Sequence, residues 1–474
     1  MVSRTPQAVT PQGTYDHVEY LDVELFGYGD IYYTTDCSVP TRYSKRYTGP
    51  IRITNTTVLR VVCFEEGKER SGVLDLTYIL NENDNLSVVS IVAHPDDLFS
   101  QYKGIYATGL QDPGPYPHKE ANYWKDWEKS ASVSLFETDG SVGFSVPCGL
   151  KIFGGFSRAQ AKKSLTCVFR EKYGASELEY PLFGEEGLLT YESFVLRAGG
   201  QDAYNARMRD EMITSLASEH LNLPVQDYRP VVLYLNGRYW GVYYIREKLN
   251  EQYVAGHFNV TKEEVIISEW AGDYCPEYKS LLRWARTHDM NVQANYDRAY
   301  EIANVQNYMD YMITQMWIGN SDNGNVKFFM TSEHPWHWIL FDTDQSFRSP
   351  QYNAIAEHLD PNKPFKFDVT SKTLLRALLK RPEFKEIFLR RMAWQINNVW
   401  TEENVIGRID EIAAMIQPDL EKDCKRWNVR YGLWESSVEH LREFAQERTR
   451  YFMTHVKQYF GLTDAQMREY GFPI

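Results

Sequence analysis

Residues 317–330 carry the side chains of this sequence best suited to chemistry; they read Trp-Ile-Gly-Asn-Ser-Asp-Asn-Gly-Asn-Val-Lys-Phe-Phe-Met. Asn320, Asp322, Asn323 and Asn325 form a polar cluster between an apolar helical run and a short β-like run. Burying such groups without partners costs about 2–7 kcal/mol each. The segment is therefore either an ordinary turn, where Asp and Asn are common, or a place where polar groups converge on a ligand.

The stretch after this cluster predicts a hairpin. "VKFFM" and "WHWILF" are β-like, "TSEHP" separates them, and "FDTDQSF" begins where the second run ends. The outer ends of a hairpin lie side by side, so we expect Asp322 and Asn325 to approach Asp342 and Asp344. Carboxylate and amide oxygens around one point suit Mg²⁺. Phosphoryl-transfer enzymes use one Asp to orient or deprotonate the attacking hydroxyl, while an Asn and a second Asp hold the metal ion.

Phosphoryl transfer also requires a cation near the phosphates, and "GGFSRAQAKKSLTCVF" offers Arg158, Lys162 and Lys163. If "KSLTCVF" is a strand, Lys163 lies on its apolar face and points inward. A buried lysine needs an anionic partner. Lys162, on the opposite face, is expected to be a solvated charge.

A predicted helix at 202–221 supplies candidate partners for Lys163. Its apolar residues recur at three- and four-residue steps, and it carries Asp210 and Glu211. Either carboxylate could pair with Lys163 as in the lysine–glutamate pair of kinases. Alternatively, the helix shows these charges to water.

Composition and motifs exclude several classes of protein. The net charge of −13 over 474 residues argues against non-specific binding to nucleic acid. No run of eighteen apolar residues predicts a membrane span, and the N-terminus lacks the apolar region of a secretory signal. GxSxG, HExxH, Walker A and Rossmann patterns are absent. His334 and His337 flank a Pro-Trp turn and are not expected to bind metal.

The six cysteines are scattered, with no CxxC and no zinc-type spacing. We therefore expect reduced, partly buried thiols. A Cys37–Cys63 bridge is an alternative that the spacing does not support.

The chain divides into a β-rich and a helix-rich part. Residues 1–80 contain short runs rich in Thr, Tyr, Val and Ile between turn residues, which predict a small all-β sandwich. The polar stretch at 81–87 is interpreted as a linker. β-like runs continue to about residue 190 and again around Asn236-Gly237, a strong hairpin signal, and the chain is mostly helical after 278. The expected fold class is α+β with two lobes.

These motifs, in this order, resemble the spore coat protein H (CotH) kinase family, atypical protein kinases with a protein-kinase-like fold. The resemblance covers about 88–460 and implies that 88–474 is a kinase domain with a β-rich N-lobe and a helical C-lobe. Residues 1–80 are similar to a chitobiase/β-hexosaminidase C-terminal-type module, an immunoglobulin-like sandwich, through "IYYTTDCSVPTRYSKRYTGPI". The kinase resemblance rests on "SIVAHPDDLFSQYKGIYATG", "GGFSRAQAKKSL", "FVLRAGGQDAYNARMRD", "YRPVVLYLNGRYWGVYYIREKLNEQY", "IGNSDNGNVKFF" and "WILFDTDQSF".

Carried over to this sequence, the resemblance implies that Asp322 is the catalytic aspartate. Asn325 and the pair Asp342/Asp344 would be the Mg²⁺ ligands, with neither aspartate of the pair preferred. Lys163 would contact the phosphates with Arg158 nearby, and Glu247 would lie near the nucleotide, where the two lobes join. The residues of a further family motif would either partner Lys163 or form structural ion pairs: Arg197, Asp202, Arg209 and Asp210.

The implied function is transfer of the ATP γ-phosphoryl group to Ser or Thr of a protein, either a surface or spore-coat protein or the chain itself, with Mg²⁺ or Mn²⁺. The first module would hold a glycan or another cell-surface partner. An extracellular, cell-surface or spore-coat location follows by analogy.

Two departures from the family and two other function classes bear on this interpretation. Phe153 stands where many relatives have an arginine, and the loop from Asp322 to Asn325 is shorter than the D-x-x-x-x-N of ordinary protein kinases. A kinase-like body could instead be a non-catalytic surface or coat scaffold. Glycoside hydrolysis would need two carboxylates about 5–10 Å apart across a sugar cleft; the sequence offers Asp342 and Asp344 for it but no recognisable cleft.

Overall fold

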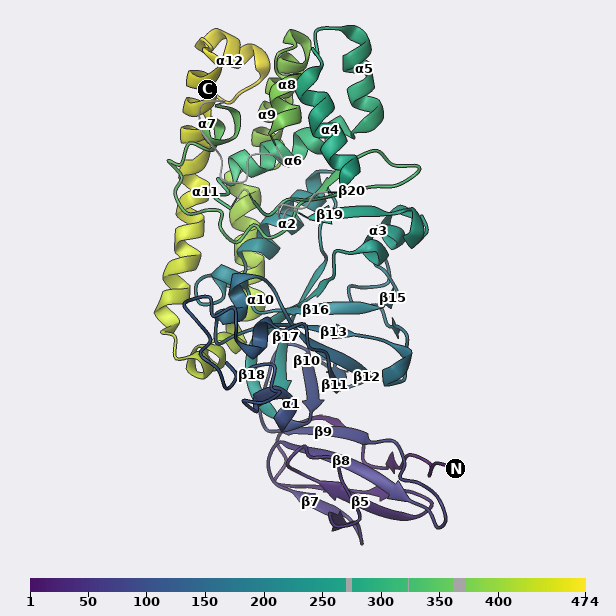
Figure 1. Cartoon of the computed structure of the whole chain (residues 1–474). Helices are drawn as coiled ribbons and strands as arrows, with labels where there is room; N and C mark the ends of the chain where they lie inside the picture. The colour runs from purple at the N-terminus through teal and green to yellow at the C-terminus, as the bar shows by residue number, and fades with distance from the viewer. Residues whose placement is uncertain (270–274, 323, 361–371) are drawn as a thin grey trace. The chain divides into compact units, whose positions relative to one another are not determined.

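The computed structural model describes residues 1–269, 275–322, 324–360 and 372–474. Asn323 of the polar cluster lies outside the described residues. The chain divides into two compact units by its internal contacts. The first unit contains Met1–Gly200, Tyr228–Glu247 and Met415–Tyr431, and the second contains Gln201–Asp227, Lys248–Ala414 and Gly432–Ile474. The fold is α+β, with an all-β N-terminal region and a helical C-terminal part (Figure 1).

The N-terminal region is built as predicted, from short strands around an apolar core. One sheet has the order β2-β9-β8-β5-β6, and the pairs β1-β4 and β3-β7 lie beside it. Val23, Leu59, Val61 and Tyr78 are fully buried between them. Cys37 and Cys63 are free thiols. The strands are β1 (Gln7–Ala8), β2 (Gly13–Tyr15), β3 (Leu21–Val23), β4 (Leu25–Phe26), β5 (Asp30–Thr34), β6 (Lys45–Arg46), β7 (Ile51–Ile53), β8 (Thr57–Phe64) and β9 (Leu74–Leu80).

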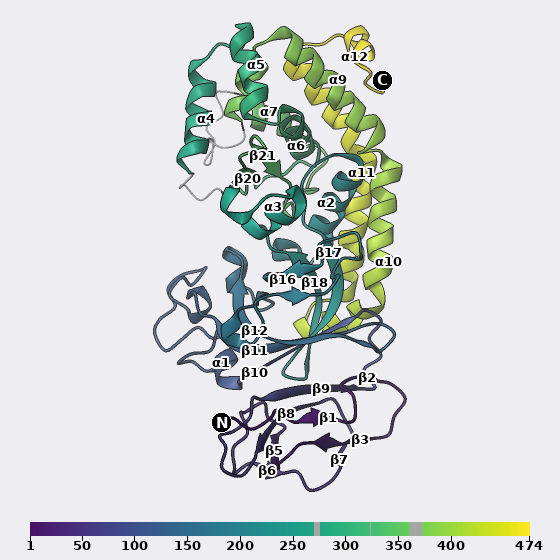
Figure 2. The ribbon, with the colours of Figure 1, turned by 90° about the vertical axis from the view of Figure 1, so that its right-hand side faces the viewer.

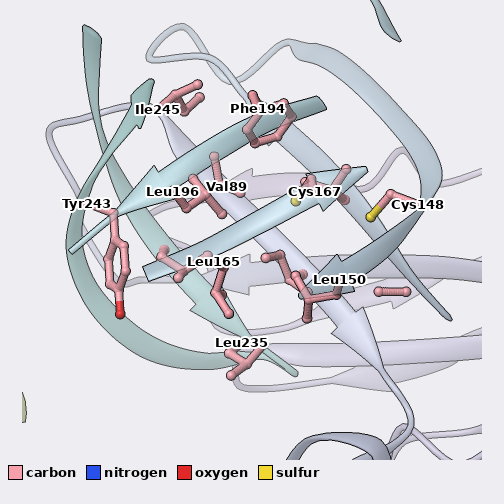
Figure 3. Close-up of a cluster of buried hydrophobic side chains, with 14 of the residues drawn as sticks. Val89, Cys148, Leu150, Leu165, Cys167, Phe194, Leu196, Leu235, Tyr243 and Ile245 are labelled. Atoms are coloured by element: carbon pink, nitrogen blue, oxygen red, sulfur yellow. The ribbon is translucent and has the colours of Figure 1, made fainter. Parts of the chain in front are cut away.

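The following strands form a closed barrel in the order β10-β11-β12-β13-β16-β18-β17. Neighbours are antiparallel except β10 and β17, which pair in parallel and close the barrel. Figure 3 shows its interior, where Leu150, Leu165, Leu196 and Ile245 are fully buried. The barrel strands are β10 (Val88–Ala93), β11 (Lys129–Phe136), β12 (Val142–Phe153), β13 (Ser164–Val168), β16 (Ser193–Arg197), β17 (Tyr228–Leu235) and β18 (Arg238–Glu247).

The turn between β17 and β18 confirms the hairpin predicted at Asn236-Gly237. The two residues have φ values of +52° and +73°, as a type I′ turn requires. The Asn236 side chain accepts a hydrogen bond from the Ala93 N–H at 2.8 Å and donates to the Ala93 carbonyl at 2.9 Å. One residue thus makes the turn and ties it to β10.

The second unit is mainly helical around a small sheet of the order β19-β20-β21 (Figure 2). Among the described residues, no helix is both long enough and apolar enough to cross a membrane. The helices and strands of the second unit are α2 (Arg209–His220), α3 (Glu251–Phe258), β19 (Ile266–Glu269), α4 (Pro276–Thr287), α5 (Gln293–Ile302), α6 (Val305–Trp317), β20 (Lys327–Met330), β21 (His337–Ile339), α7 (Ala354–Leu359), α8 (Thr373–Leu378), α9 (Pro382–Asn398), α11 (Tyr431–Phe460) and α12 (Asp464–Tyr470). α10 (Glu402–Trp427) begins in this unit and ends in the first.

The prediction that Lys162 is a solvated charge is wrong. Lys162 is 1% exposed, and its ammonium donates to the Asp423 carboxylate at 2.9 Å and to the Val242 carbonyl at 2.7 Å. The same carboxylate oxygen accepts the Val242 N–H at 2.9 Å. This buried ion pair joins the last turns of α10 to the barrel. Its partner is 261 residues away in the chain, so no local pattern reveals it.

Replacing Lys162 by Met is expected to destabilise the fold, because it leaves the buried Asp423 carboxylate without its counter-charge. The expected loss in the free energy of unfolding is about 3–5 kcal/mol, measured by urea denaturation. Lys172→Met is the matched control, since Lys172 pairs with Glu128 but has a side chain that is 60% exposed; its loss should stay below about 1 kcal/mol. Equal losses in the two variants would contradict a stabilising buried pair.

Candidate functional site

The hairpin predicted after the polar cluster is confirmed. β20 and β21 pair antiparallel, with Lys327 opposite Ile339. The Asn307 side chain of α6 accepts the Trp338 N–H at 2.7 Å and donates to the Trp338 carbonyl at 3.1 Å. The hairpin is therefore fixed to the helix that leads into the cluster, and the two lie together in Figure 2.

The side chains at the outer ends of this hairpin converge on Asn325. Its amide Nδ2 donates to Oδ2 of Asp322 at 3.0 Å and to Oδ2 of Asp342 at 2.5 Å. The Ser321 hydroxyl donates to the Gln345 carbonyl at 3.2 Å. The loop of Asp322 and the segment of Asp342 are thus joined at two points, although nearly twenty residues separate the aspartates in the chain.

The ionisation of Asp322 is opposed by its surroundings. Burial raises the pKa of Asp322, and the negative charge of Asp342 raises it further. The Gly324 N–H and the positive charge of Arg348 lower this pKa in turn. Arg348 was not among the residues predicted from the sequence; its position directly after "FDTDQSF" is the signal that could have identified it.

The donor set fits a hard divalent cation. Asp322, Asn325 and Asp342 carry carboxylate and amide oxygens, and a cation would relieve the repulsion between the carboxylates. Mg²⁺ keeps several waters and is usually bound by one or two carboxylates together with substrate phosphates. In the part of the chain that the structure describes, no group of three or more His, Cys, Asp or Glu side chains is placed to hold a metal ion. One or two of these carboxylates with the amide oxygen match a metal ion that is bound together with a phosphorylated ligand.

Asp344 is placed differently from Asp342. The Asp344 residue is 2% exposed, and its Oδ2 accepts the Gln201 N–H at 3.0 Å. Asp342 has a φ of +53°, a left-handed conformation that costs roughly 1–2 kcal/mol for most residues and less for Asp. Such conformations persist where the surroundings impose them, and they are concentrated at functional sites.

Three further predicted residues hold α2 and the segment after β21 in place. Oδ2 of Asp202 accepts the N–H groups of Met208 and Arg209 at 3.0 and 3.1 Å, and Oδ1 lies 3.7 Å from the Arg209 guanidinium. Oδ1 of Asp210 accepts the Thr343 N–H at 2.7 Å and the Thr343 hydroxyl at 2.9 Å. Arg209 also donates to the Asp344 carbonyl at 3.0 Å. In the structure these residues make positioning contacts.

In the first unit, Lys163 is buried as predicted, with 4% exposure. Its ammonium donates to the carbonyls of Arg158 and Gln160, the latter at 2.7 Å, and lies 4.0 Å from the centre of the Tyr123 ring. Burial lowers the pKa of Lys163 to about 8. Within the described part of its own unit, carbonyl dipoles and a ring surround this charge. Its pairing with Asp210 or Glu211, which belong to the second unit, stays a prediction.

Arg158, whose carbonyl accepts from Lys163, contacts the chain around Gly154 and Tyr123 through its side chain. Its Nη1 donates to the Tyr123 carbonyl at 3.3 Å, its Nε donates to the Gly154 carbonyl, and its guanidinium lies 5.6 Å from the centre of the Trp124 ring. Burial lowers the pKa of Arg158. Tyr123 and Trp124 were not predicted from the sequence, although the aromatic run "NYWKDW" is a visible signal.

The remaining predicted residues end or begin regular elements. Arg197 is the last residue of β16 and Glu247 the last of β18, where Glu247 is 2% exposed. Glu211 lies in the first turn of α2 and is 1% exposed. Their roles in nucleotide binding or in pairing with Lys163 stay predictions.

The first unit also contains a groove of about 840 Å³ that involves the N-terminal strands and the turn between β17 and β18. Its lining is rich in hydroxyl, amide and charged side chains, among them Thr34, Asp36, Ser44, Arg52, Asn55 and Arg238. The candidate catalytic side chains do not contribute to it. The groove is therefore separate from the candidate catalytic residues.

Comparison with known families assigns both regions of the chain. Residues 150–452, more than half of the chain, match the family described as CotH kinase protein. Residues 10–75 match the chitobiase/beta-hexosaminidase C-terminal domain. No curated protein matches the chain.

The raised pKa of Asp322 predicts a pH-dependent gain in stability for Asp322→Asn. Between the ordinary carboxyl pKa and the raised one, the folded state binds more protons than the unfolded state, so wild-type stability falls as pH rises through this window. The variant lacks this loss. At pH 7 we expect its free energy of unfolding, measured by urea denaturation, to exceed that of wild type. The gain should be about 1 kcal/mol or less because the group is partly solvated. The difference should vanish near pH 3; a variant less stable than wild type at pH 7 would contradict the assigned repulsion.

Proposed function

Because the chain belongs to the CotH kinase protein family, we propose that it transfers the γ-phosphoryl group of ATP to a Ser or Thr hydroxyl of a protein. Family membership indicates a protein-kinase-like function, and one observation supports the finer proposal. The Asn325 amide joins the Asp322 and Asp342 carboxylates at the ends of one hairpin. This arrangement combines a proton acceptor with oxygen ligands for a divalent metal, which phosphoryl transfer requires.

In the proposed reaction, Asp322 accepts the proton of the substrate hydroxyl. The hydroxyl oxygen forms a bond to the γ-phosphorus as the bond from this phosphorus to the β–γ bridging oxygen breaks, and ADP leaves with that electron pair. Asn325 and Asp342 would hold Mg²⁺ or Mn²⁺, and when bound the metal neutralises charge on the phosphates. We favour Asp342 over Asp344 as the ligand because Asp342 contacts Asn325, whereas Oδ2 of Asp344 accepts a backbone N–H.

Lys163, Arg158 and Glu247 are proposed to bind the nucleotide. The support for Lys163 is electrostatic. Its ammonium is buried against carbonyls and a ring, with a pKa lowered to about 8. An anionic phosphate close to this ammonium would supply a counter-charge and stabilise its protonated form.

The proposal includes a division into domains. Residues 1–80 form the first module, 81–87 the linker and 88–474 a kinase domain with a β-rich and a helical lobe. It is supported by the start of the barrel at β10 and by the extents of the two family matches.

The first module is proposed to hold a glycan or another surface partner. This rests on the match of residues 10–75 and on the polar lining of the groove. Hydroxyl, amide and cationic groups are those that hydrogen-bond to sugar hydroxyls and carboxylates.

Replacing Asp322 by Ala tests the proposal directly. We expect the variant to keep its fold and its binding of ATP with Mg²⁺, since Asp322 accepts the hydroxyl proton and the nucleotide is held elsewhere. Transfer from radiolabelled ATP to the chain itself or to a generic Ser/Thr substrate should fall by about a hundredfold or more. A variant as active as wild type would contradict the role of Asp322.

A thermal melt with millimolar ATP and Mg²⁺ separates an enzyme from a non-catalytic scaffold. A ligand that binds the native state raises its melting temperature, so wild type should melt at a higher temperature with both present. Asp342→Asn is the matched variant, because Asn tolerates the left-handed backbone conformation while the metal-binding charge is lost. Its shift should require more Mg²⁺. No shift in wild type would favour the scaffold.

A further inference from the structure

Arg448, on α11, is fully buried and donates to main-chain carbonyls from two different segments. Nε donates to the Trp317 carbonyl at 2.6 Å and Nη2 to the Met316 carbonyl at 2.7 Å. Nη1 donates to the carbonyls of Pro350 and Tyr352, both at 2.8 Å. One side chain thus satisfies four acceptors, with all three of its nitrogens engaged.

These acceptors flank the candidate site on both of its segments. Met316 and Trp317 are the last residues of α6, five residues before Asp322. A cation at this end of a helix donates to the last carbonyls and opposes the negative end of the helix dipole. Pro350 and Tyr352 follow Asp344 by a few residues. Arg448 therefore connects the end of α6, which precedes Asp322, to the segment that follows Asp342 and Asp344.

The same two segments are joined by neighbouring contacts. The Phe347 N–H donates to the Ile318 carbonyl at 3.0 Å, and the Ser321 hydroxyl donates to the Gln345 carbonyl at 3.2 Å. Phe347 has a φ of +55° and packs with Trp317 and Phe444. Together with the Asn325–Asp342 bond, these contacts form a continuous seam, and Arg448 lies at its buried end.

A guanidinium suits this place for geometric reasons. Its five N–H donors lie in one plane and reach several acceptors at fixed angles, whereas an ammonium is a compact charge with three donors. Burial lowers the pKa of Arg448. The group nevertheless remains charged near neutral pH, because its ordinary value is above 12. Burying this charge is compensated by the four carbonyls. Removing it takes a donor from each of them, and of the four the Met316 and Tyr352 carbonyls also accept a backbone N–H, from Gly319 at 3.3 Å and from Ala354 at 3.0 Å.

We propose that Arg448 is a positioning residue for phosphoryl transfer: it sets the spacing between the loop of Asp322 and Asn325 and the segment of Asp342. The inference rests on the proposed function and adds a residue that neither the motifs nor the family match assigns a role. A displacement of about 1 Å in such a constellation can cost a hundredfold in rate.

Arg448→Lys tests this proposal, with Arg450→Lys as the matched control. Arg450 lies on the same helix, has a side chain that is 66% exposed and pairs with Glu447. Autophosphorylation would be measured per folded molecule, at a temperature where melting curves show both variants folded. We expect kcat of Arg448→Lys to fall about tenfold to a hundredfold and its half-saturating Mg²⁺ concentration to rise about tenfold. KM for ATP should change by no more than about twofold.

A merely structural role would lower the melting temperature without changing the Mg²⁺ requirement of the folded molecules, and that outcome would overturn the proposal.

Ser321→Ala is the second variant in case Arg448→Lys does not fold, because it removes an exposed contact of the same seam. We expect a smaller fall in kcat and a smaller rise in the half-saturating Mg²⁺ concentration. If Ser321→Ala then matches wild type, the proposal fails. An inactive wild type with an unchanged melting temperature in ATP and Mg²⁺ would overturn the proposed function itself, which distinguishes the two failures.

Discussion

The carboxylates of Asp322 and Asp342 share one amide group, and their mutual repulsion is the constraint on which the candidate site depends. Asn325 donates to both, but a neutral amide cannot balance two negative charges. Part of the imbalance appears as the raised pKa of Asp322. A divalent cation would relieve it more completely. In the proposed function this imbalance costs some stability and favours binding of a positive ion, as is common where function competes with stability.

The remainder of the second unit holds this arrangement in place through buried polar contacts. Asn307 fixes the hairpin to α6, Asp210 fixes α2 to Thr343, and Arg448 joins the end of α6 to the chain after Asp344. Each contact pairs a side chain with main-chain groups of another segment. A side chain that binds main-chain atoms fixes the path of a loop whatever residues the loop carries, so these contacts support the site from outside the recognisable motif.

The sequence revealed those parts of the fold whose causes are local. Asn236-Gly237 indicated its hairpin because a type I′ turn needs two residues that tolerate positive φ. The runs around "TSEHP" indicated the second hairpin and thereby the meeting of Asn325 with Asp342. Lys163 was expected to be buried because it shares the apolar face of a predicted strand. What was missed depends on distant partners: Lys162 and Asp423, the parallel closure of the barrel by β10 and β17, and Arg448. A single sequence carries no signal for such pairs.

The most direct measurement of the central claim is the location of a divalent ion. Crystals grown with Mn²⁺ and a non-hydrolysable ATP analogue would give an anomalous signal at each bound ion. We predict an ion coordinated by oxygens of Asn325 and Asp342, at about 2.0–2.3 Å as for hard oxygen ligands, with a phosphate oxygen completing the shell. An ion bound elsewhere, with Asn325 still donating to both carboxylates, would contradict it.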